Sequence, residues 1–505
     1  MRTRTTIGLA AALAIAAPTI AFAPPGVPMA SPATAVLTGD PGPGYFATPN
    51  VEWLGMIPFN SGSAGARVVG DRLYVTDQFG ITIYDLTDPT LPTPISFTPS
   101  PQQYYFTEED VTTNGEILVV GSFGELAGHT TPLDTIFVYD VSNPTPSATL
   151  LGTLSSVDAD QHTLTCILDC TWVLGSEGAV IDLTDPTAPT MAGNWAVDAD
   201  LNAAGIEGSH DVTEVRPGLV MISSNPIVYA DFRVPTDPAV LSIGALPDTR
   251  FIHGNLWPGA GTDDLLLVGG EDFGDCNDTT GAAFMTFAAA DVRDGDPVAA
   301  AYAGHDLPGN SDDNRRDGRG SQDNPGKGQG GPAASSPEAT PQFRLVDEYR
   351  VGTGIYTDGD SPYNQFCAHW FTTEPGFHDG GLVAAAWYEH GTRFLDVAPD
   401  GSISERGWFV PLGGSQSAAY FITEDIVLTT DYQRGIDILR IDRNAPASPG
   451  EDNVVMVGQA AAVAAGTVDP DSFFPWFGRE SVLGAPSTGL DAAGNYICPL
   501  PLRRA

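Results

Sequence analysis

The feature that most constrains this chain is a repeat: a short apolar strand, a turn and a second strand that ends in Asp recur seven times along it. The clearest copy, RLYVTDQFGITIYDLTDP at residues 72–89, predicts a strand, an acidic turn, a second strand and a stop at Asp-Pro. Further copies begin near residues 116, 171, 219, 264, 382 and 425. Such regular spacing indicates an array of β modules.

Each copy is followed by one more strand-like segment, so the complete unit has four strands. The expected fourth strands read TPISFT, ATLLGTL, MAGNWAV, VLSIGAL, RLVDEYRV and ISERGWFVP. The seventh copy has none directly after it, but WLGMIPFNSGS at residues 53–63 matches GWFVPLGGS at residues 407–415. We therefore predict an all-β, seven-bladed β-propeller of four-stranded blades, closed by an N-terminal strand in the last blade, which removes exposed sheet edges.

The repeats also resemble a known family. The segments LYVTDQFGITIYDLTDP and AVIDLTDPTAP are similar to LVIVD repeats, which occur in secreted and surface β-propeller proteins. The resemblance covers residues 51–445 and implies the propeller fold. It implies no particular activity, because LVIVD proteins are mostly uncharacterised and one propeller architecture hosts many functions.

The N-terminal segment has the pattern of an export signal. We expect residues 1–35 to be a secretory signal peptide and leader, because Arg2 and Arg4 precede the apolar run at residues 7–23. A retained N-terminal anchor is the alternative. No other segment approaches the roughly 20 apolar residues that span a bilayer, so we expect a mature chain without a transmembrane helix, secreted or on the surface of a bacterium.

Three further segments flank or interrupt the repeats. Residues 36–50 form a Pro/Gly-rich lead-in, and residues 446–505 form a C-terminal tail without a predicted structure. Residues 304–341 are polar and rich in Gly and Pro, a composition that cannot support a packed core. We predict that they are a disordered insertion between the third and fourth strands of the fifth blade.

The charge is strongly negative. The net charge is −41, with 63 acidic residues and Lys327 as the single lysine, which argues against a nucleic acid as a partner. Adaptation to salt, cation binding and a biased composition all remain open as reasons for this acidity.

The five cysteines of an exported chain permit disulfides and leave one cysteine over. In the segment HTLTCILDCTWV, a tight reversal at Leu168 and Asp169 can bring Cys166 and Cys170 together. The remaining three allow one long-range bridge and one free thiol, with the pairing open: Cys276, Cys367 and Cys498.

Half of the eight histidines fall at one register of the repeat. When the residues that open each unit are aligned, the shared position holds Ala66, Glu109, His162, His210, His253, His369 and Ala419. The first strand of a propeller blade lines the central channel, so these positions should form a ring around one mouth of the channel. We also expect His129 and His390 on this face, and His305 and His378 elsewhere.

Clustered neutral imidazoles are common ligands of transition metals, and nearby carboxylates can orient their second ring nitrogens. We therefore predict one Zn, Cu or Fe ion held by the four histidines of the register, with Glu109 beside them. The second strands should end on the same face with a mainly acidic ring: Asp77, Glu125, Glu177, Asn225, Glu271, Glu389 and Asp431. Without the imidazoles such a ring would suit calcium.

A structural role is the alternative for the same residues. Histidines at strand starts often bond a neighbouring backbone, and Asp favours turns through bonds to its own backbone. Aromatic residues near the register can either wall a pocket or fill the wedges between blades: Tyr104, Tyr105, Trp257, Trp370, Phe371, Trp387, Tyr388 and Tyr420.

Two classes of function fit the sequence. The first is a binding scaffold, expected to be a monomer, whose loops engage a protein, a glycan or a cell-surface ligand. The second is a metal-dependent enzyme, such as an oxidoreductase, with its ion in the channel mouth. The first is favoured because the chain has no serine nucleophile elbow, no zinc-protease helix motif and no dinucleotide loop.

Overall fold

The computed structural model describes residues 36–39, 41–58, 65–77, 80–101, 111–121, 135–156, 163–206, 209–246, 252–271, 283–295, 342–351, 367–432, 434–448 and 454–473. Contacts divide the chain into residues 1–31 and residues 32–505, and every described residue belongs to the second unit. The expected signal segment lies outside the described residues. Within them, no helix has the length and hydropathy needed to cross a membrane.

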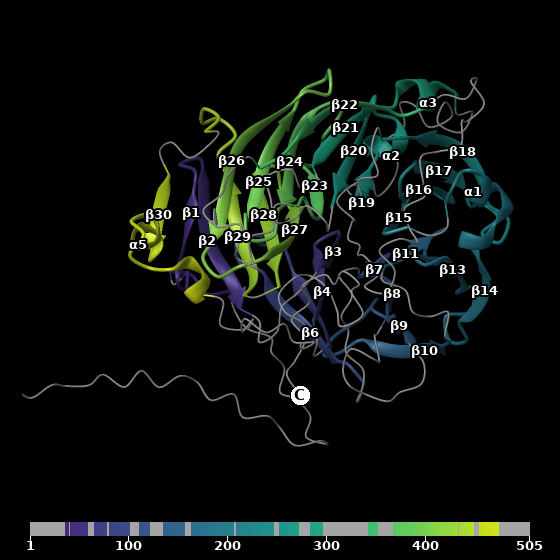
Figure 1. The fold of residues 1–505 in the computed structure, drawn as a ribbon. Helices are drawn as coiled ribbons and strands as arrows, with labels where there is room; N and C mark the ends of the chain where they lie inside the picture. Colours follow the sequence, from purple (N-terminus) through teal and green to yellow (C-terminus); the bar gives the residue numbers. More distant parts are fainter. Residues whose placement is uncertain are drawn as a thin grey trace, which may run out of the picture. The chain divides into compact units, whose positions relative to one another are not determined.

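The described chain is an all-β propeller of seven antiparallel blades, as the repeat predicts (Figure 1). Blade one contains β3 (Ala66–Val69), β4 (Arg72–Asp77), β5 (Gly80–Asp85) and β6 (Thr93–Pro99). Blade two contains β7 (Thr112–Thr113), β8 (Ile117–Val120), β9 (Thr135–Asp140) and β10 (Thr149–Ser155). Blade three contains β11 (Leu164–Ile167), β12 (Trp172–Gly175), β13 (Ala179–Asp182) and β14 (Thr190–Asn194). Blade four contains β15 (Asp211–Arg216), β16 (Leu219–Ser223), β17 (Ile227–Asp231) and β18 (Ala239–Gly244).

The remaining blades follow in chain order. Blade five contains β19 (Ile252–Leu256), β20 (Leu265–Gly270), β21 (Phe284–Ala288) and β22 (Arg344–Tyr349). Blade six contains β23 (Phe371–Thr373), β24 (Gly381–Ala386), β25 (Thr392–Val397) and β26 (Ile403–Pro411). Blade seven contains β27 (Gln416–Phe421), β28 (Ile426–Asp431) and β29 (Gly435–Ile441). Short helices are η1 (Trp195–Val197), α1 (Ala199–Ala203), α2 (Pro258–Gly261), α3 (Ala290–Gly295), α5 (Ala460–Ala464) and η3 (Pro470–Phe473).

The ring is closed by an N-terminal strand. Strand β2 (Val51–Pro58) pairs antiparallel with β29 and is the fourth strand of blade seven. The register places Ile57 opposite Ile436 and Val51 opposite Ile441. The predicted closure by the segment that begins at Trp53 is therefore confirmed.

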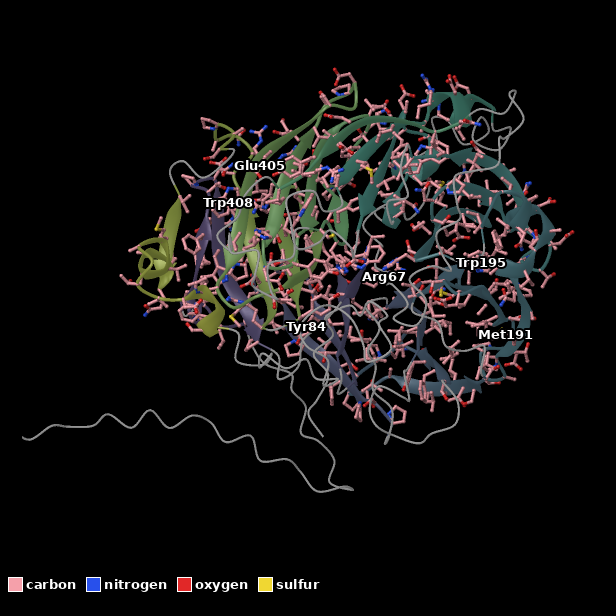
Figure 2. All side chains as sticks on the ribbon, in the orientation of Figure 1. Arg67, Tyr84, Met191, Trp195, Glu405 and Trp408 are labelled. Carbon is pink, nitrogen blue, oxygen red and sulfur yellow. A yellow bond between two sulfur atoms is a disulfide. The ribbon has the colours of Figure 1, made fainter. Side chains whose placement is uncertain are left out.

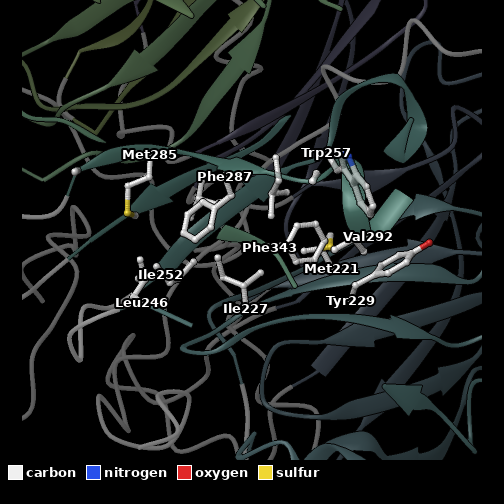
Figure 3. Close-up of a cluster of buried hydrophobic side chains, with 14 of the residues drawn as sticks. Met221, Ile227, Tyr229, Leu246, Ile252, Trp257, Met285, Phe287, Val292 and Phe343 are labelled. Atoms are coloured by element: carbon white, nitrogen blue, oxygen red, sulfur yellow. The ribbon is translucent and has the colours of Figure 1, made fainter. Parts of the chain in front are cut away.

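Apolar clusters hold neighbouring blades together. In the described part of the chain, each pair of adjacent blades shares one buried cluster, including the pair formed by blades seven and one. Figure 3 shows the cluster between blades four and five, which contains Met221 and Ile227 from blade four and Ile252, Met285 and Phe287 from blade five. The inner strands are largely apolar, and β16 and β20 are buried at every residue, because both faces of a blade are covered by its neighbours.

Polar side chains also bridge the first strands of neighbouring blades, which contact one another. The Thr163 hydroxyl donates to the His210 carbonyl at 3.1 Å, and the Thr372 hydroxyl donates to the Ala419 carbonyl at 3.0 Å. The Cys166 N–H donates to the Thr112 hydroxyl at 2.7 Å. These bonds satisfy buried backbone groups at the inner edge of the blades.

Blade six is larger than the sequence predicts. Strand β1 (Gly44–Ala47), from the lead-in, pairs with β26, and β30 (Val455–Gly458), from the tail, pairs with β1. Both segments are too short and too unlike the repeat to be recognised as strands. They bury an apolar cluster with α5 on the outer side of β26, so part of the lead-in and part of the tail extend the propeller.

Two further sequence predictions concern the fourth strand of blade three and the insertion in blade five. The expected strand MAGNWAV ends at Asn194, because Trp195 turns into η1 and its indole N–H donates to the Gly175 carbonyl at 2.9 Å (Figure 2). Strands β21 and β22 pair although the insertion separates them in sequence. The insertion at residues 304–341 itself lies outside the described residues.

Two cysteine predictions fall within the described chain. Cys166 and Cys170 lie at disulfide distance, with 2.15 Å between their sulfur atoms, and Leu168 and Asp169 between them adopt left-handed conformations. Cys367 is also disulfide-bonded. The two other cysteines of the expected long-range pairing lie outside the described residues.

Truncation of Ile57 tests the closure strand. Its side chain is fully buried between blades seven and one, so Ile57→Ala should lower the free energy of unfolding by about 2–5 kcal/mol through lost burial and a residual cavity. Urea unfolding measures the change. The control Glu52→Ala, which removes only an exposed ion pair from the same strand, should cost less than about 1 kcal/mol; equal losses would contradict the closure argument.

Candidate metal centre

Three of the four aligned histidines lie at the start of the first strands of three consecutive blades. His210 immediately precedes β15, His253 is the second residue of β19, and His369 lies two residues before β23. Backbone bonds fix two of them, because the His210 N–H donates to the Ser223 carbonyl at 3.1 Å and the His369 N–H donates to the Ala386 carbonyl at 2.8 Å. All three side chains are buried.

The three imidazoles lie against one another. The ring centroids of His210 and His253 are 3.8 Å apart, and those of His253 and His369 are 4.0 Å apart. The propeller thus brings together side chains from blades four, five and six at one end of the first strands. Neutral imidazoles at such distances can share one ion.

A buried carboxylate joins the histidines. Glu271 follows the end of β20, which runs back to the same end of blade five. Its Oε2 lies 4.0 Å from Nε2 of His210 and 3.8 Å from Nε2 of His253. Two ligands that are each about 2.0–2.2 Å from an ion lie at most about 4.4 Å apart, so these spacings fit a shared ion.

A backbone carbonyl orients the third imidazole. Nδ1 of His369 bonds to the Ser417 carbonyl in blade seven. Because a carbonyl only accepts hydrogen bonds, Nδ1 carries the proton and Nε2 is the nitrogen with the lone pair. Metal-ligating histidines are commonly oriented by a bond of this kind.

Aromatic rings surround the cluster. The Trp370 ring packs edge-on against His253 with 4.3 Å between centroids, and it covers Gly254, where a Cβ atom would lie 2.5 Å from the indole. The Tyr388 ring lies 4.7 Å from His369, and Tyr432 stacks on Tyr388 with 6.1 Å between centroids. The centre is therefore enclosed by large side chains in addition to the blades.

Tyr388 also makes a polar contact with the centre. Its hydroxyl donates a hydrogen bond to Oε1 of Glu271. Tyr388 has a φ of 47°, in the left-handed region that bulky residues rarely adopt. Residues held in this region cost about 1–3 kcal/mol and are found where the surrounding structure fixes them, often at functional sites.

Several predicted site residues fall outside this cluster. Glu109, His162, His129 and His305 lie outside the described residues, although Thr163, next to His162 in sequence, bonds the His210 carbonyl. Ala66 and Ala419 occupy the register in blades one and seven and cannot ligate.

His390 lies at the same end of blade six, in the turn between β24 and β25. Burial, together with the positive charge of Arg393, holds the pKa of His390 well below its usual range. His390 is thus a neutral buried imidazole in the folded protein. Neither His390 nor His369 belongs to the group whose ligand atoms all lie within 4.8 Å of one another, which consists of His210, His253 and Glu271.

The predicted acidic residues at the ends of the second strands differ in their contacts. Glu271 reaches the imidazoles, as described above. Asp431 instead accepts a bond from the Arg434 N–H at 3.1 Å, which is the structural turn role weighed for these residues. Nothing is described for the side chains of Asp77 and Glu125.

The aromatic residues divide between both expected roles. Trp257, Phe371 and Trp387 belong to apolar clusters between blades, and the Tyr420 hydroxyl accepts a bond from the Ala66 N–H. Trp370 and Tyr388 line the centre. Tyr432 and Ser417 had no sequence signal beyond their places at the end of β28 and in β27.

A second group of ligand-type side chains lies at the other end of the first strands. Nδ1 of His378 bonds to Oδ1 of the buried Asp263 at 2.7 Å, and the Asp379 N–H donates to Oδ2 of Asp263 at 3.1 Å. This group joins blades five and six. His378 was expected to lie away from the histidine ring, and it does.

The electrostatics of this second group follow from its burial. Desolvation raises the pKa of Asp263, against the lowering effect of its bond to His378. The same hydrogen bond raises the pKa of His378, whose imidazole is 72% exposed. Both oxygens of the Asp263 carboxylate accept hydrogen bonds, one from His378 and one from Asp379, so these three residues link blade five to blade six.

The fold and the buried cluster define a β-propeller with a candidate metal centre. No protein-family model and no curated protein sequence matches the chain. Similar solved structures include the WD40 β-propeller domain of Doa1, at 8% identity over 79% of this chain and 98% of that chain, with a TM-score of 0.42. Another is Raptor from Chaetomium thermophilum, at 12% identity over 80% of this chain and 30% of that chain, with a TM-score of 0.44.

Replacement of His378 should remove a pH-dependent part of the stability. Because Asp263 raises the pKa of His378 above 6.5, protonated His378 stabilises the fold below that pH, and this contribution is lost as the pH rises through the folded-state pKa. The difference in free energy of unfolding between wild type and His378→Gln should be larger near pH 6 than near pH 8.5, by less than about 1 kcal/mol because solvent screens the exposed imidazole. Urea titrations at both pH values measure it, and a difference that grows with pH would refute the argument.

Proposed function

We propose that this protein is an exported, LVIVD-type propeller that acts as a binding scaffold and holds one transition-metal ion between His210, His253 and Glu271, with His369 beside them. The observation that carries the proposal is the convergence of two buried imidazoles and one buried carboxylate, with the buried ring of His369 4.0 Å from that of His253. Blades four and five would share the ion, which would tie them together at one end of the channel.

The donor set favours a transition metal over calcium. Two imidazole nitrogens and one carboxylate, with a third imidazole next to them, suit Zn, Cu or Fe, whereas calcium takes six to eight oxygen ligands. The bond from His369 to the Ser417 carbonyl leaves its Nε2 as the nitrogen with the lone pair, on a ring that packs against His253.

The scaffold role rests on the fold and on the charge. A propeller presents the loops of all its blades around one mouth, where they can engage a protein, a glycan or a cell-surface ligand. The net charge of −41 favours partners with positive surfaces. Export is proposed from the N-terminal pattern of two arginines before an apolar run.

Metal content tests the proposal directly. The protein, purified without a His tag and stripped with a chelator, is incubated separately with Zn²⁺, Cu²⁺, Fe²⁺ or Ca²⁺, desalted and analysed by elemental mass spectrometry. We expect about one transition-metal ion per chain and no retained calcium. His210→Gln should weaken binding at least about tenfold, because one nitrogen ligand is lost.

The matched control is His378→Gln, which removes an exposed histidine outside the centre. It should bind metal like the wild type. Circular dichroism and thermal melting of the metal-free proteins separate loss of a ligand from loss of the fold. A wild-type protein that retains no transition metal would exclude the metal centre and leave the scaffold role alone.

A second candidate function, a metal-dependent oxidoreductase, is favoured by the rings at the centre. Trp370 packs on His253 at 4.3 Å and Tyr388 on His369 at 4.7 Å, which places oxidisable side chains against the ligands. An ion with three protein ligands, here His210, His253 and Glu271, keeps a fourth position for water or a substrate.

Oxygen consumption separates the two candidates. Copper- or iron-loaded protein is mixed with ascorbate as reductant in air, and dissolved oxygen is followed with an electrode. An oxidoreductase centre should consume many equivalents of oxygen per chain, and His210→Gln should abolish this. Consumption of no more than about one equivalent would favour the scaffold.

A further inference from the structure

Glu271 is contacted from two sides. Its Oε2 faces the imidazoles of His210 and His253 at 4.0 and 3.8 Å, while its Oε1 accepts a hydrogen bond from the Tyr388 hydroxyl. Tyr388 belongs to blade six and Glu271 to blade five, so the bond crosses a blade boundary. The two oxygens of one carboxylate are thus assigned to different partners.

The position of Tyr388 is itself fixed from blade seven. Its N–H donates to the Gln416 carbonyl at 3.1 Å, and the Gln416 N–H donates to the Tyr388 carbonyl at 2.9 Å. This pair of bonds holds Tyr388 in the left-handed conformation with a φ of 47°. The ring packs against both His369 and Tyr432, with centroid distances of 4.7 and 6.1 Å, and the hydroxyl bonds Oε1 of Glu271.

We propose that Tyr388 is a positioning residue that makes Glu271 a ligand through one oxygen. By occupying Oε1, the phenol keeps the carboxylate from rotating or from binding an ion through both oxygens, and it aims Oε2 at the ion shared with His210 and His253. Partners of this kind behind a ligand typically change metal affinity 10–100-fold when removed. The inference rests on the proposed metal centre.

Metal titrations of Tyr388→Phe test this role, because the variant keeps the ring and removes only the hydroxyl. Co²⁺ is the probe, since its visible absorption reports the geometry of its ligands, and competition with Zn²⁺ gives the affinity. We expect binding about 10–100-fold weaker than in the wild type, together with a changed Co²⁺ spectrum.

A double-mutant cycle shows whether Tyr388 acts through Glu271. Glu271→Gln should weaken binding and change the spectrum by itself. If the phenol acts only by positioning the carboxylate, Tyr388→Phe should cause no further loss in the Glu271→Gln background. Equal losses from Tyr388→Phe in both backgrounds would overturn the inference.

Tyr420→Phe is the matched control. It also removes a buried tyrosine hydroxyl that bonds a neighbouring blade, in this case the Ala66 N–H at 2.8 Å, but it lies outside the centre. It should lower the melting temperature without changing the Co²⁺ spectrum or affinity. A spectral change in Tyr420→Phe equal to that of Tyr388→Phe would show a general effect of loosened blades and would refute the positioning role.

The outcomes for the two proposals remain distinct. A wild-type protein that binds neither Co²⁺ nor Zn²⁺ would overturn the metal centre, and the role of Tyr388 with it. Stoichiometric binding by the wild type, with unchanged affinity and spectrum in Tyr388→Phe, would overturn the role of Tyr388 alone.

Discussion

The pairing of β2 with β29 is the interaction on which the rest of the structure depends. It completes the sheet of blade seven with a strand from the other end of the chain and covers the edge that blade seven would otherwise expose. Through it, the apolar cluster between blades seven and one forms, so every blade is packed on both faces. Without this closure, the facing sides of blades seven and one would be exposed, and the seven blades would not form a closed ring.

The closed ring also explains why the candidate centre exists. His210, His253 and His369 are far apart in sequence and meet because the first strands of adjacent blades lie side by side. Hydroxyls on these strands, such as that of Thr163, bond the neighbouring blade and fix the spacing. The geometry of the centre is therefore a property of the ring, and no single blade contains it.

Features that recur in each repeat can be predicted from the sequence, whereas features that occur only once in the fold cannot. Short apolar strands and turn residues are local signals that recur in each copy, so the blades, the closure and the common position of His210, His253 and His369 could be predicted from the sequence. The contact between Tyr388 and Glu271 joins residues 117 positions apart across two blades, and it depends on a backbone conformation that tyrosine rarely adopts. Strands β1 and β30 were missed for a related reason, because each has four residues and no counterpart in the repeat.

The extra strands of blade six have a consequence for the rate at which the ring can open. Strand β1 lies between β26 and β30, and the linker that follows it is tied to both neighbouring blades, since Thr48 bonds Trp408 and the Asn50 carbonyl accepts from the Asp442 N–H. The closure strand begins at the next residue, so it cannot be peeled off from its N-terminal end until β30 and β1 have been released. Release of β2 from this end would therefore also break the pairs of β1 with β26 and β30, and contacts that must break before unfolding lengthen the lifetime of a native state.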